Sequence, residues 1–298
     1  MRQQSRTRAA RWIFITPFMV MFGLFFAAPI VYAIVQSIFA EKGSALGFGP
    51  PETVFVWFDN YSRAMSDEAF RESLVRLVQF AAILVPLMVV TSLTLALLLD
   101  SGRALWPRFF RVLYFAPYGI PGVVATLLWG FLYIPATSPV LEMLSTIGIE
   151  IEPLSSGGVL FAIANIALWV FAGYNMIILL SALDAVPAEL YEAARMDGAS
   201  AWGLIWHIKL PLVRSSIILV TVFTIIGTLQ LFVEPLVLLP LTTAIDSNFT
   251  PNLAAYNQAF ALGNPNLAAA MAVIVALLGM VFSFGFLRAV NRKGNRAW

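Results

Sequence analysis

The stretch LVRLVQFAAILVPLMVVTSLTLALLL, residues 74–99, decides the class of fold. It runs for 26 residues and carries one charged side chain, Arg76. A helix needs about 20 mostly apolar residues to cross the hydrocarbon core of a bilayer. The stretch is therefore long enough and apolar enough to form a membrane-spanning helix.

Five further stretches of the chain meet the same criterion of length and hydropathy. Charges, prolines or polar turns bound each of them. We therefore predict an all-α polytopic membrane protein with about six transmembrane helices, which are Trp12–Phe39, Leu74–Leu99, Phe109–Tyr133, Val159–Ala182, Ser215–Leu239 and Leu267–Leu287.

The overall composition agrees with a lipid environment. Of the 298 residues, 60% are hydrophobic and only 11% are charged, and the mean hydropathy is +0.85. Soluble domains carry about 25% charged residues, so this chain does not have the charge to cover itself with a polar surface. The absence of cysteine and the single histidine, His207, argue against a metal site and against a membrane-embedded enzyme.

The distribution of charge predicts the orientation in the membrane. Basic residues gather in both terminal segments and in the second and fourth connections between spans, whereas acidic residues crowd the first and second outer loops. Because lysine and arginine are enriched on the cytoplasmic side, we expect both termini in the cytoplasm. We divide the chain into residues 1–72 (tail, first span and outer loop), 73–290 (a five-helix core) and 291–298 (a basic tail).

The fourth connection, residues 183–213, carries strong helix signals. Pro187 suits a first helical position, and Glu189 and Glu192 favour the positive end of a helix. Gly198 is placed to end that helix in a left-handed conformation, and Ser200 can cap a second short helix. These signals predict a helical hairpin outside the membrane. It either inserts into the groove of a partner or lies on the lipid headgroups.

Short motifs in and around this hairpin resemble a known family. The hairpin contains EAA at 192–194, DGA at 197–199 and IKLP at 208–211, and these resemble the signature loop of ABC importer permeases. FAP at 115–117, IP at 120–121 and FDNY at 58–61 are similar to motifs of the binding-protein-dependent carbohydrate branch, which includes maltose-type and glycerol-3-phosphate-type permeases. The resemblance covers nearly the whole chain in the family's motif order.

The resemblance implies a type I ABC importer permease fold in a bacterial or archaeal plasma (inner) membrane. It also implies a sugar substrate, a homologous second permease, two copies of an ATPase subunit and an external solute-binding protein, with no nucleic acid partner. The hairpin would couple to the ATPase through Glu192, Ala193, Ala194, Asp197 and Gly198. The sequence has no G-x-x-x-x-G-K-[ST] motif. We therefore expect a chain without catalytic activity or cofactor, and ATP and Mg bound by the partner ATPase.

Polar residues inside the predicted spans mark a candidate substrate pathway, because such residues usually face the bundle or a cavity. Glu234 is the only acid well inside a predicted span, and Gln230 lies one helical turn before it. Asn165 and Trp169 are likewise one turn apart on the fourth span. The four residues are candidates for a sugar site, or else Asn165 and Gln230 form hydrogen bonds between helices and Trp169 packs.

Two further features bear on function. Pro117, Gly119, Pro121 and Gly122 interrupt the third span, and broken helices at membrane depth often line a substrate site. An ion-coupled secondary transporter of a small polar solute is the alternative reading. That class normally shows inverted repeats and several intramembrane ionisable residues, and we find no such repeat and only Glu234.

Overall fold

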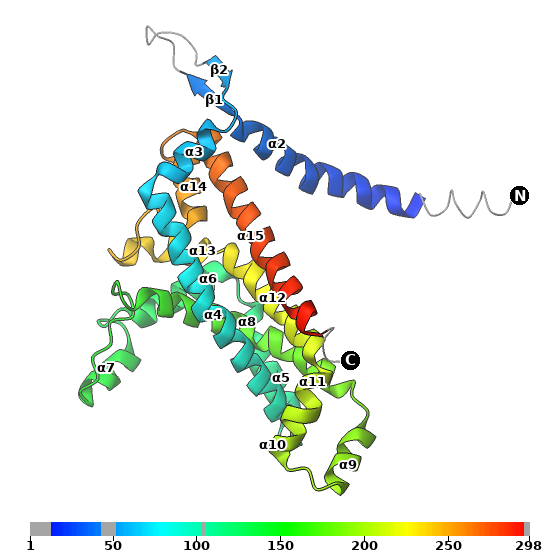
Figure 1. The fold of residues 1–298 in the computed structure, drawn as a ribbon. Helices are drawn as coiled ribbons and strands as arrows, with labels where there is room; N and C mark the ends of the chain where they lie inside the picture. The colour runs from blue at the N-terminus through cyan, green and yellow to red at the C-terminus, as the bar shows by residue number, and fades with distance from the viewer. Residues whose placement is uncertain (1–12, 43–51, 103–104, 295–298) are drawn as a thin grey trace, which may run out of the picture. The chain divides into compact units, whose positions relative to one another are not determined.

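The computed structural model describes residues 13–42, 52–102 and 105–294. Trp12, Arg103 and the predicted basic residues at the extreme ends of the chain therefore lie outside the described residues. The chain forms two compact units. The first comprises Met1–Arg71 and Ala254–Ala276, and the second comprises Glu72–Leu253 and Leu277–Trp298. Figure 1 labels their helices and strands.

Within the described residues, four helices are long and apolar enough to cross a membrane. They are Ile13–Ser37, which contains η1 (Gly23–Ala27) and α2 (Ala28–Ser37), α4 (Glu68–Asp100), α8 (Val159–Asp184) and α15 (Pro265–Gly294). They match the first, second, fourth and sixth predicted spans. The side chains of Ile13–Ser37 are mostly exposed and apolar, as lipid or a second membrane subunit requires.

Two bent helix pairs complete a total of up to six spans. The third span consists of α5 (Pro107–Phe115) and η2 (Ala116–Gly119), followed after a 99° bend by α6 (Gly122–Tyr133). The break falls at Ile120 and Pro121, whose backbones are extended, so the interruption expected from the proline–glycine cluster is confirmed. The second pair joins Ala201–Leu212, which belongs to the predicted cytoplasmic hairpin, to α12 (Arg214–Leu229), which begins the fifth predicted span, at a bend of 68°.

The fifth predicted span, Ser215–Leu239, is wrong as one continuous helix. Helix α12 ends at Leu229, and α13 (Val233–Leu238) begins after a break. Pro235 explains the break, because its ring would clash with the carbonyl of Leu231 in a continuous helix. The amide of Asn252 replaces the lost bonds by donating to the carbonyl oxygens of Leu229, at 2.8 Å, and Leu231, at 3.3 Å.

In the first unit, the FDNY motif organises the segment that follows the first span. Strands β1 (Phe39–Lys42) and β2 (Glu52–Phe55) pair antiparallel, and α3 (Asp59–Ser66) follows them. The buried Asn60 donates to the carbonyl oxygens of Ser37, at 2.8 Å, and Phe39, at 2.7 Å. The hydroxyl of Tyr61 bonds that of Ser37 at 2.6 Å. The motif thus ties α3 to the end of the first span and to β1.

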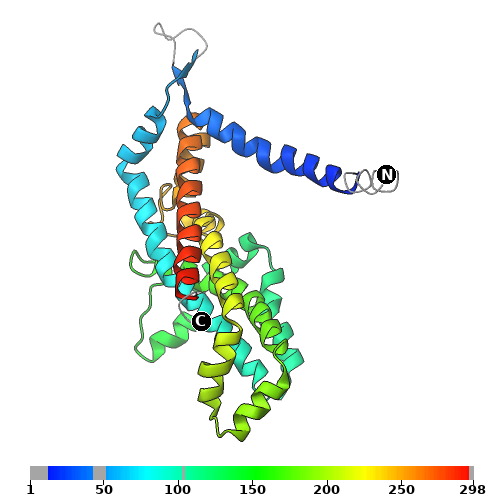
Figure 2. The ribbon, with the colours of Figure 1, turned by 45° about the vertical axis from the view of Figure 1, so that its right-hand side comes forward.

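In the second unit, α8 is the central helix. More than half of its residues are buried, and it contacts α5, α6, α12 and α13. Peripheral elements are α7 (Pro139–Thr146), η4 (Leu239–Leu241) and α14 (Pro251–Phe260), the last of which runs into the first unit. The hairpin of α9 (Ala188–Met196) and α10 (Ala201–Leu204) projects beyond the ends of the helices at one end of this unit (Figure 2).

The end of the second unit that carries the hairpin is the one predicted to be cytoplasmic. From α10 the chain continues through η3 (Ile205–Lys209) and α11 (Leu210–Leu212) into α12. Lys209 forms an ion pair with Asp100 at the end of α4, and Arg111 forms one with Asp184 at the end of α8. The second and fourth connections therefore lie together, as their shared basic charge predicts.

Candidate functional site

The coupling hairpin, residues 187–212, has the local structure that its sequence predicts, with one shift. Pro187 stands immediately before α9 rather than at its first position. Gly198 has a φ of +84°, in the left-handed region that favours glycine. The N–H of Ala199 donates to the carbonyl of Ala194 at 2.9 Å and closes the end of α9. The Ser200 hydroxyl accepts from the N–H of Gly203 at 3.1 Å and caps α10.

The hairpin offers a solvent-facing surface for a partner. No residue of α9 is buried in this chain. Of the predicted coupling residues, Glu192, Ala193, Asp197 and Gly198 are exposed and Ala194 is half-buried. Exposed large apolar side chains join them, among them Leu190, which is 46% exposed, Met196, which is 88% exposed, and Trp202, which is 70% exposed. Exposed apolar groups beside charges are typical of an interaction surface.

The sequence reasoning missed Met196 and Trp202. Both are large apolar residues on the segment predicted to lie outside the membrane, where a cluster of exposed apolar residues indicates a docking surface. The sequence indicated Trp202 only weakly, because tryptophan also anchors helices at the membrane surface.

A second candidate site is a cavity of about 590 Å³ in the second unit. It lies where the break between η2 and α6 and the break between α12 and α13 meet α4 and α8. Tyr118 and Gly122 flank the break between η2 and α6, and Gln230 and Glu234 flank the break between α12 and α13. Backbone groups freed at such breaks are tolerated at membrane depth only against protein or a water-filled cavity.

The cavity combines aromatic rings with polar side chains. The rings of Tyr118 and Tyr174 stack at a centroid distance of 4.6 Å and an interplanar angle of 12°. The ring of Phe171 meets Tyr118 edge-on at 6.0 Å. Asn175, Thr224, Thr228, Gln230 and Glu234 supply hydrogen-bonding groups along the wall. This mixture of apolar faces with a few polar groups is typical of a small-molecule site.

The four predicted pathway residues separate into two pairs. Gln230 and Glu234 line the cavity, but they do not share a helix face, because the break after Leu229 separates them. Asn165 and Trp169 are not among the lining residues. The amide of Asn165 donates to the hydroxyl of Tyr133 at 2.9 Å, which is the interhelical bond that we considered as its alternative. The ring of Trp169 packs edge-on against Trp129 at 5.8 Å.

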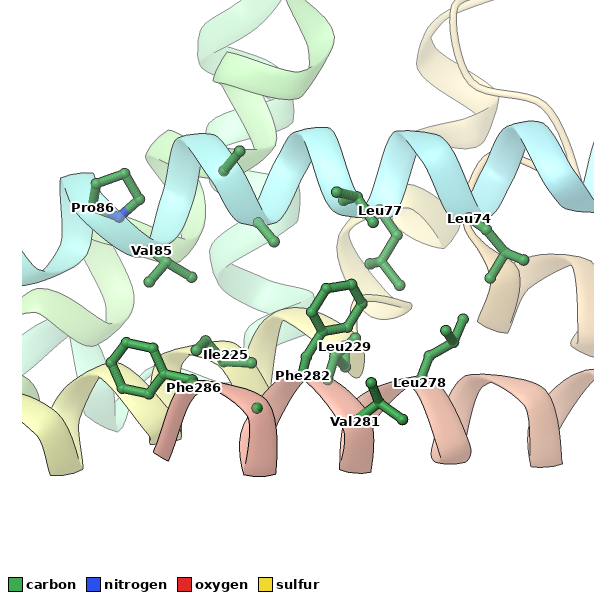
Figure 3. A pocket seen from close by; sticks show the side chains of 14 residues that line it. Leu74, Leu77, Val85, Pro86, Ile225, Leu229, Leu278, Val281, Phe282 and Phe286 are labelled. Carbon is green, nitrogen blue, oxygen red and sulfur yellow. The ribbon is translucent and has the colours of Figure 1, made fainter. Parts of the chain in front are cut away.

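A second cavity, of about 560 Å³, is apolar throughout. Figure 3 shows its wall, in which side chains of α4, α12 and α15 point toward one another, among them Leu77, Ile225 and Phe282. A sugar hydroxyl placed here would lose its hydrogen bonds to water without replacement. Of these two cavities, the one lined by Tyr118, Gln230 and Glu234 therefore suits a polar solute.

Comparison with known proteins agrees with this architecture. Residues 62–295 match the model of the family described as "binding-protein-dependent transport system inner membrane component", and the chain belongs to that family. The lactose transport system permease protein LacF of Rhizobium radiobacter is 30% identical over 95% of this chain and 94% of its own length. The sn-glycerol-3-phosphate transport system permease protein UgpA of Agrobacterium fabrum is 28% identical, with the same coverage of both chains.

The fold is also that of a solved transporter. A bacterial ABC transporter that imports the acidic polysaccharide alginate contains a chain that superposes with a TM-score of 0.81 and 19% identity. The match covers 98% of this chain and 99% of that one. The predicted type I importer permease fold is thereby confirmed, as is the resemblance to permeases of the carbohydrate branch. The chain is a multi-pass membrane component of a transport system.

Proposed function

We propose that this chain is the transmembrane permease subunit of an ATP-driven ABC importer that moves a sugar into the cytoplasm of a bacterium or archaeon. An external solute-binding protein delivers the sugar, and a homologous second permease completes the pathway. Two copies of a separate ATPase subunit bind ATP and Mg and hydrolyse the nucleotide, so this chain itself is not catalytic. Family membership, together with an exposed hairpin at the predicted cytoplasmic end, carries this proposal.

The hairpin supplies the mechanical connection. Its exposed face, with Glu192, Asp197 and the apolar Met196 and Trp202, fits a cleft in the ATPase. When two ATPase subunits close on ATP, the docked hairpins move as rigid bodies and carry the attached spans with them. The continuous path from α10 through η3 and α11 into α12 ends at the cavity, where Thr228 and Gln230 lie.

The cavity supplies the pathway for the sugar. Stacked aromatic rings match the apolar face of a sugar ring, and amide, hydroxyl and carboxylate groups match its hydroxyls. The relatives support this class of cargo, because one is named for lactose and another for arabinooligosaccharides.

The transport class can be tested by isolating the chain gently from its native membranes. We expect an ATPase subunit, a second permease and ATP-dependent uptake of a sugar in reconstituted vesicles. Uptake that persists without ATP and stops when the ion gradient is dissipated would instead support the ion-coupled alternative, and it would overturn the proposal.

The cavity can be tested by replacing Tyr174 with leucine. Loss of a stacked ring removes roughly 0.5–1.5 kcal/mol, so the KM for sugar uptake should rise about two- to twelvefold. Glu234→Gln, which keeps the shape and removes the charge, should also change the KM. Phe161→Leu is the matched control, because this exposed aromatic residue lies on the same helix and does not line the cavity. A KM unchanged in both cavity variants would exclude the cavity from the pathway.

A further inference from the structure

Three elements that are far apart in sequence meet at the base of the coupling hairpin. The ammonium group of Lys209, in η3, forms an ion pair with the carboxylate of Asp100, the last residue of α4. The same ammonium group lies 5.1 Å from the centre of the Tyr191 ring, in α9. One cation thus links α4 to both arms of the hairpin. We call the three side chains the hairpin joint.

The ion pair of the hairpin joint is shielded from solvent to a degree unusual for charged groups. The side chains of Lys209 and Asp100 are only 13% and 11% exposed. The hydroxyl oxygen of Tyr191 is buried and has no hydrogen-bond partner among the described residues. Burial raises the pKa of the Tyr191 phenol, and the negative charges of Asp100 and Asp184 raise it further. The ring therefore stays neutral and electron-rich beside the cation.

A neighbouring ion pair provides an internal comparison. Arg111 and Asp184 are 3.4 Å apart, but their side chains are 42% and 50% exposed. Exposed pairs of this kind contribute little. Loss of one partner from a buried pair, by contrast, leaves an uncompensated charge and is strongly unfavourable. Of these two pairs, the one between Lys209 and Asp100 is shielded and joins the hairpin to α4, whereas the exposed pair joins α5 to α8.

The position of the joint relative to the cavity gives it a functional meaning. Helix α4 extends from Glu68 to Asp100 with Pro86 inside it, and its residues Phe80, Leu84 and Met88 line the polar cavity. Met88 lies about 18 Å along the helix axis from Asp100, at 1.5 Å per residue. A displacement of the hairpin applied at Asp100 therefore reaches the cavity wall at Met88 through a helical segment that contains no proline.

We propose that Lys209 is a positioning residue that couples movement of the hairpin to α4 through Asp100 and Tyr191. This inference rests on the proposed ATP-driven import. The covalent path through α11 and α12 moves the part of the cavity wall that α12 contributes. The hairpin joint moves the part that α4 contributes. Without the joint, the ATPase would still move the hairpin while α4 lags behind.

The test uses the complete transporter, with its ATPase and binding protein, reconstituted in vesicles. Lys209→Met keeps the aliphatic stem and removes the charge. Substitutions along a coupling path change coupling by about 0.5–2 kcal/mol, so the amount of sugar imported per ATP hydrolysed should fall roughly two- to thirtyfold. Copurification of the ATPase should be unchanged. Arg111→Met is the matched control and should retain the wild-type ratio, because its ion pair is exposed.

Two further variants keep the test decisive. Should Lys209→Met fail to accumulate, the pair Asp100→Asn with Lys209→Met leaves no unpaired charge and should show the same loss of coupling. The charge exchange Asp100→Lys with Lys209→Asp should restore part of it, which a general loss of packing would not. A wild-type ratio of sugar imported to ATP hydrolysed in the variant with Asp100→Asn and Lys209→Met would overturn the role of the hairpin joint but not the proposed function. An isolated wild-type complex without an ATPase would overturn the proposed function as well.

A distance measurement gives an independent readout. The native chain contains no cysteine, so Leu98→Cys and Glu189→Cys place two unique spin labels on exposed positions of α4 and α9. We expect one narrow distance distribution in the complex, and a broad one when Lys209→Met is added. An equally narrow distribution in both proteins would overturn the joint.

Discussion

Replacing Gly173 with alanine is expected to remove most of the folded protein from the membrane. A Cβ atom at this position of α8 would lie 1.8 Å from the carbonyl oxygen and 2.4 Å from the carbonyl carbon of Tyr114. These are backbone atoms at the end of α5, so no change of rotamer relieves the clash. The two helices must separate, and overpacking of this kind costs about 1–3 kcal/mol or more.

The consequence reaches the cavity, because Phe171 and Tyr174 flank Gly173 on α8 and Tyr118 follows α5. The amount of the protein in isolated membranes and its thermal unfolding in detergent would measure the effect. Gly285→Ala is the matched control. A Cβ at Gly285, within α15, meets no atom within 4 Å, so its accumulation should equal that of the wild type. Normal accumulation and an unchanged Tm for Gly173→Ala would contradict the close helix crossing.

Replacing Gly198 with proline is expected to abolish uptake while leaving insertion of the spans intact. Proline fixes φ near −65°, whereas Gly198 has a φ of +84°. Proline also removes the N–H that donates to the carbonyl of Arg195 at 3.0 Å. The turn between α9 and α10 therefore cannot form as it is, and the surface that faces the ATPase loses its shape.

The measurements are uptake and copurification of the ATPase, with membrane insertion followed by protease protection. A Cβ at Gly198 meets no atom within 4 Å. Glycine is therefore favoured here by its backbone conformation and not by a lack of room for a side chain. Gly198→Asn is the matched control, because asparagine visits the left-handed region more readily than other side chains. It should retain most of the uptake. Full uptake by the proline variant would show that the turn has no part in coupling.

The sequence was sufficient for the membrane class and for most of the helices. A run of 20 or more apolar residues has few alternatives to a spanning helix, because lipid cannot satisfy exposed backbone groups. The hairpin was predictable for a local reason too. The conformation of Gly198 and the cap at Ser200 depend on residues no more than a few positions away.

The lining of the cavity was not predictable to the same degree. In a soluble helix, the apolar face identifies the core, but membrane spans are apolar on the lipid side as well as the protein side. Tyr118, Phe171 and Tyr174 therefore looked like any other aromatic residues of the spans. The polar residues carried more signal, and two of the four, Gln230 and Glu234, do line the cavity.

What the sequence alone determined is the local part: which segments are helical and apolar, where Gly198 turns the chain, and which motifs the hairpin carries. What only the tertiary structure decided depends on contacts between distant residues. Asn252 donates a hydrogen bond to the carbonyl of Leu229 at the break, from more than 20 positions away in the sequence. Lys209 pairs with Asp100, which is 109 positions away. Such partners are brought together by the packing of whole helices, so no local pattern in the sequence specifies them.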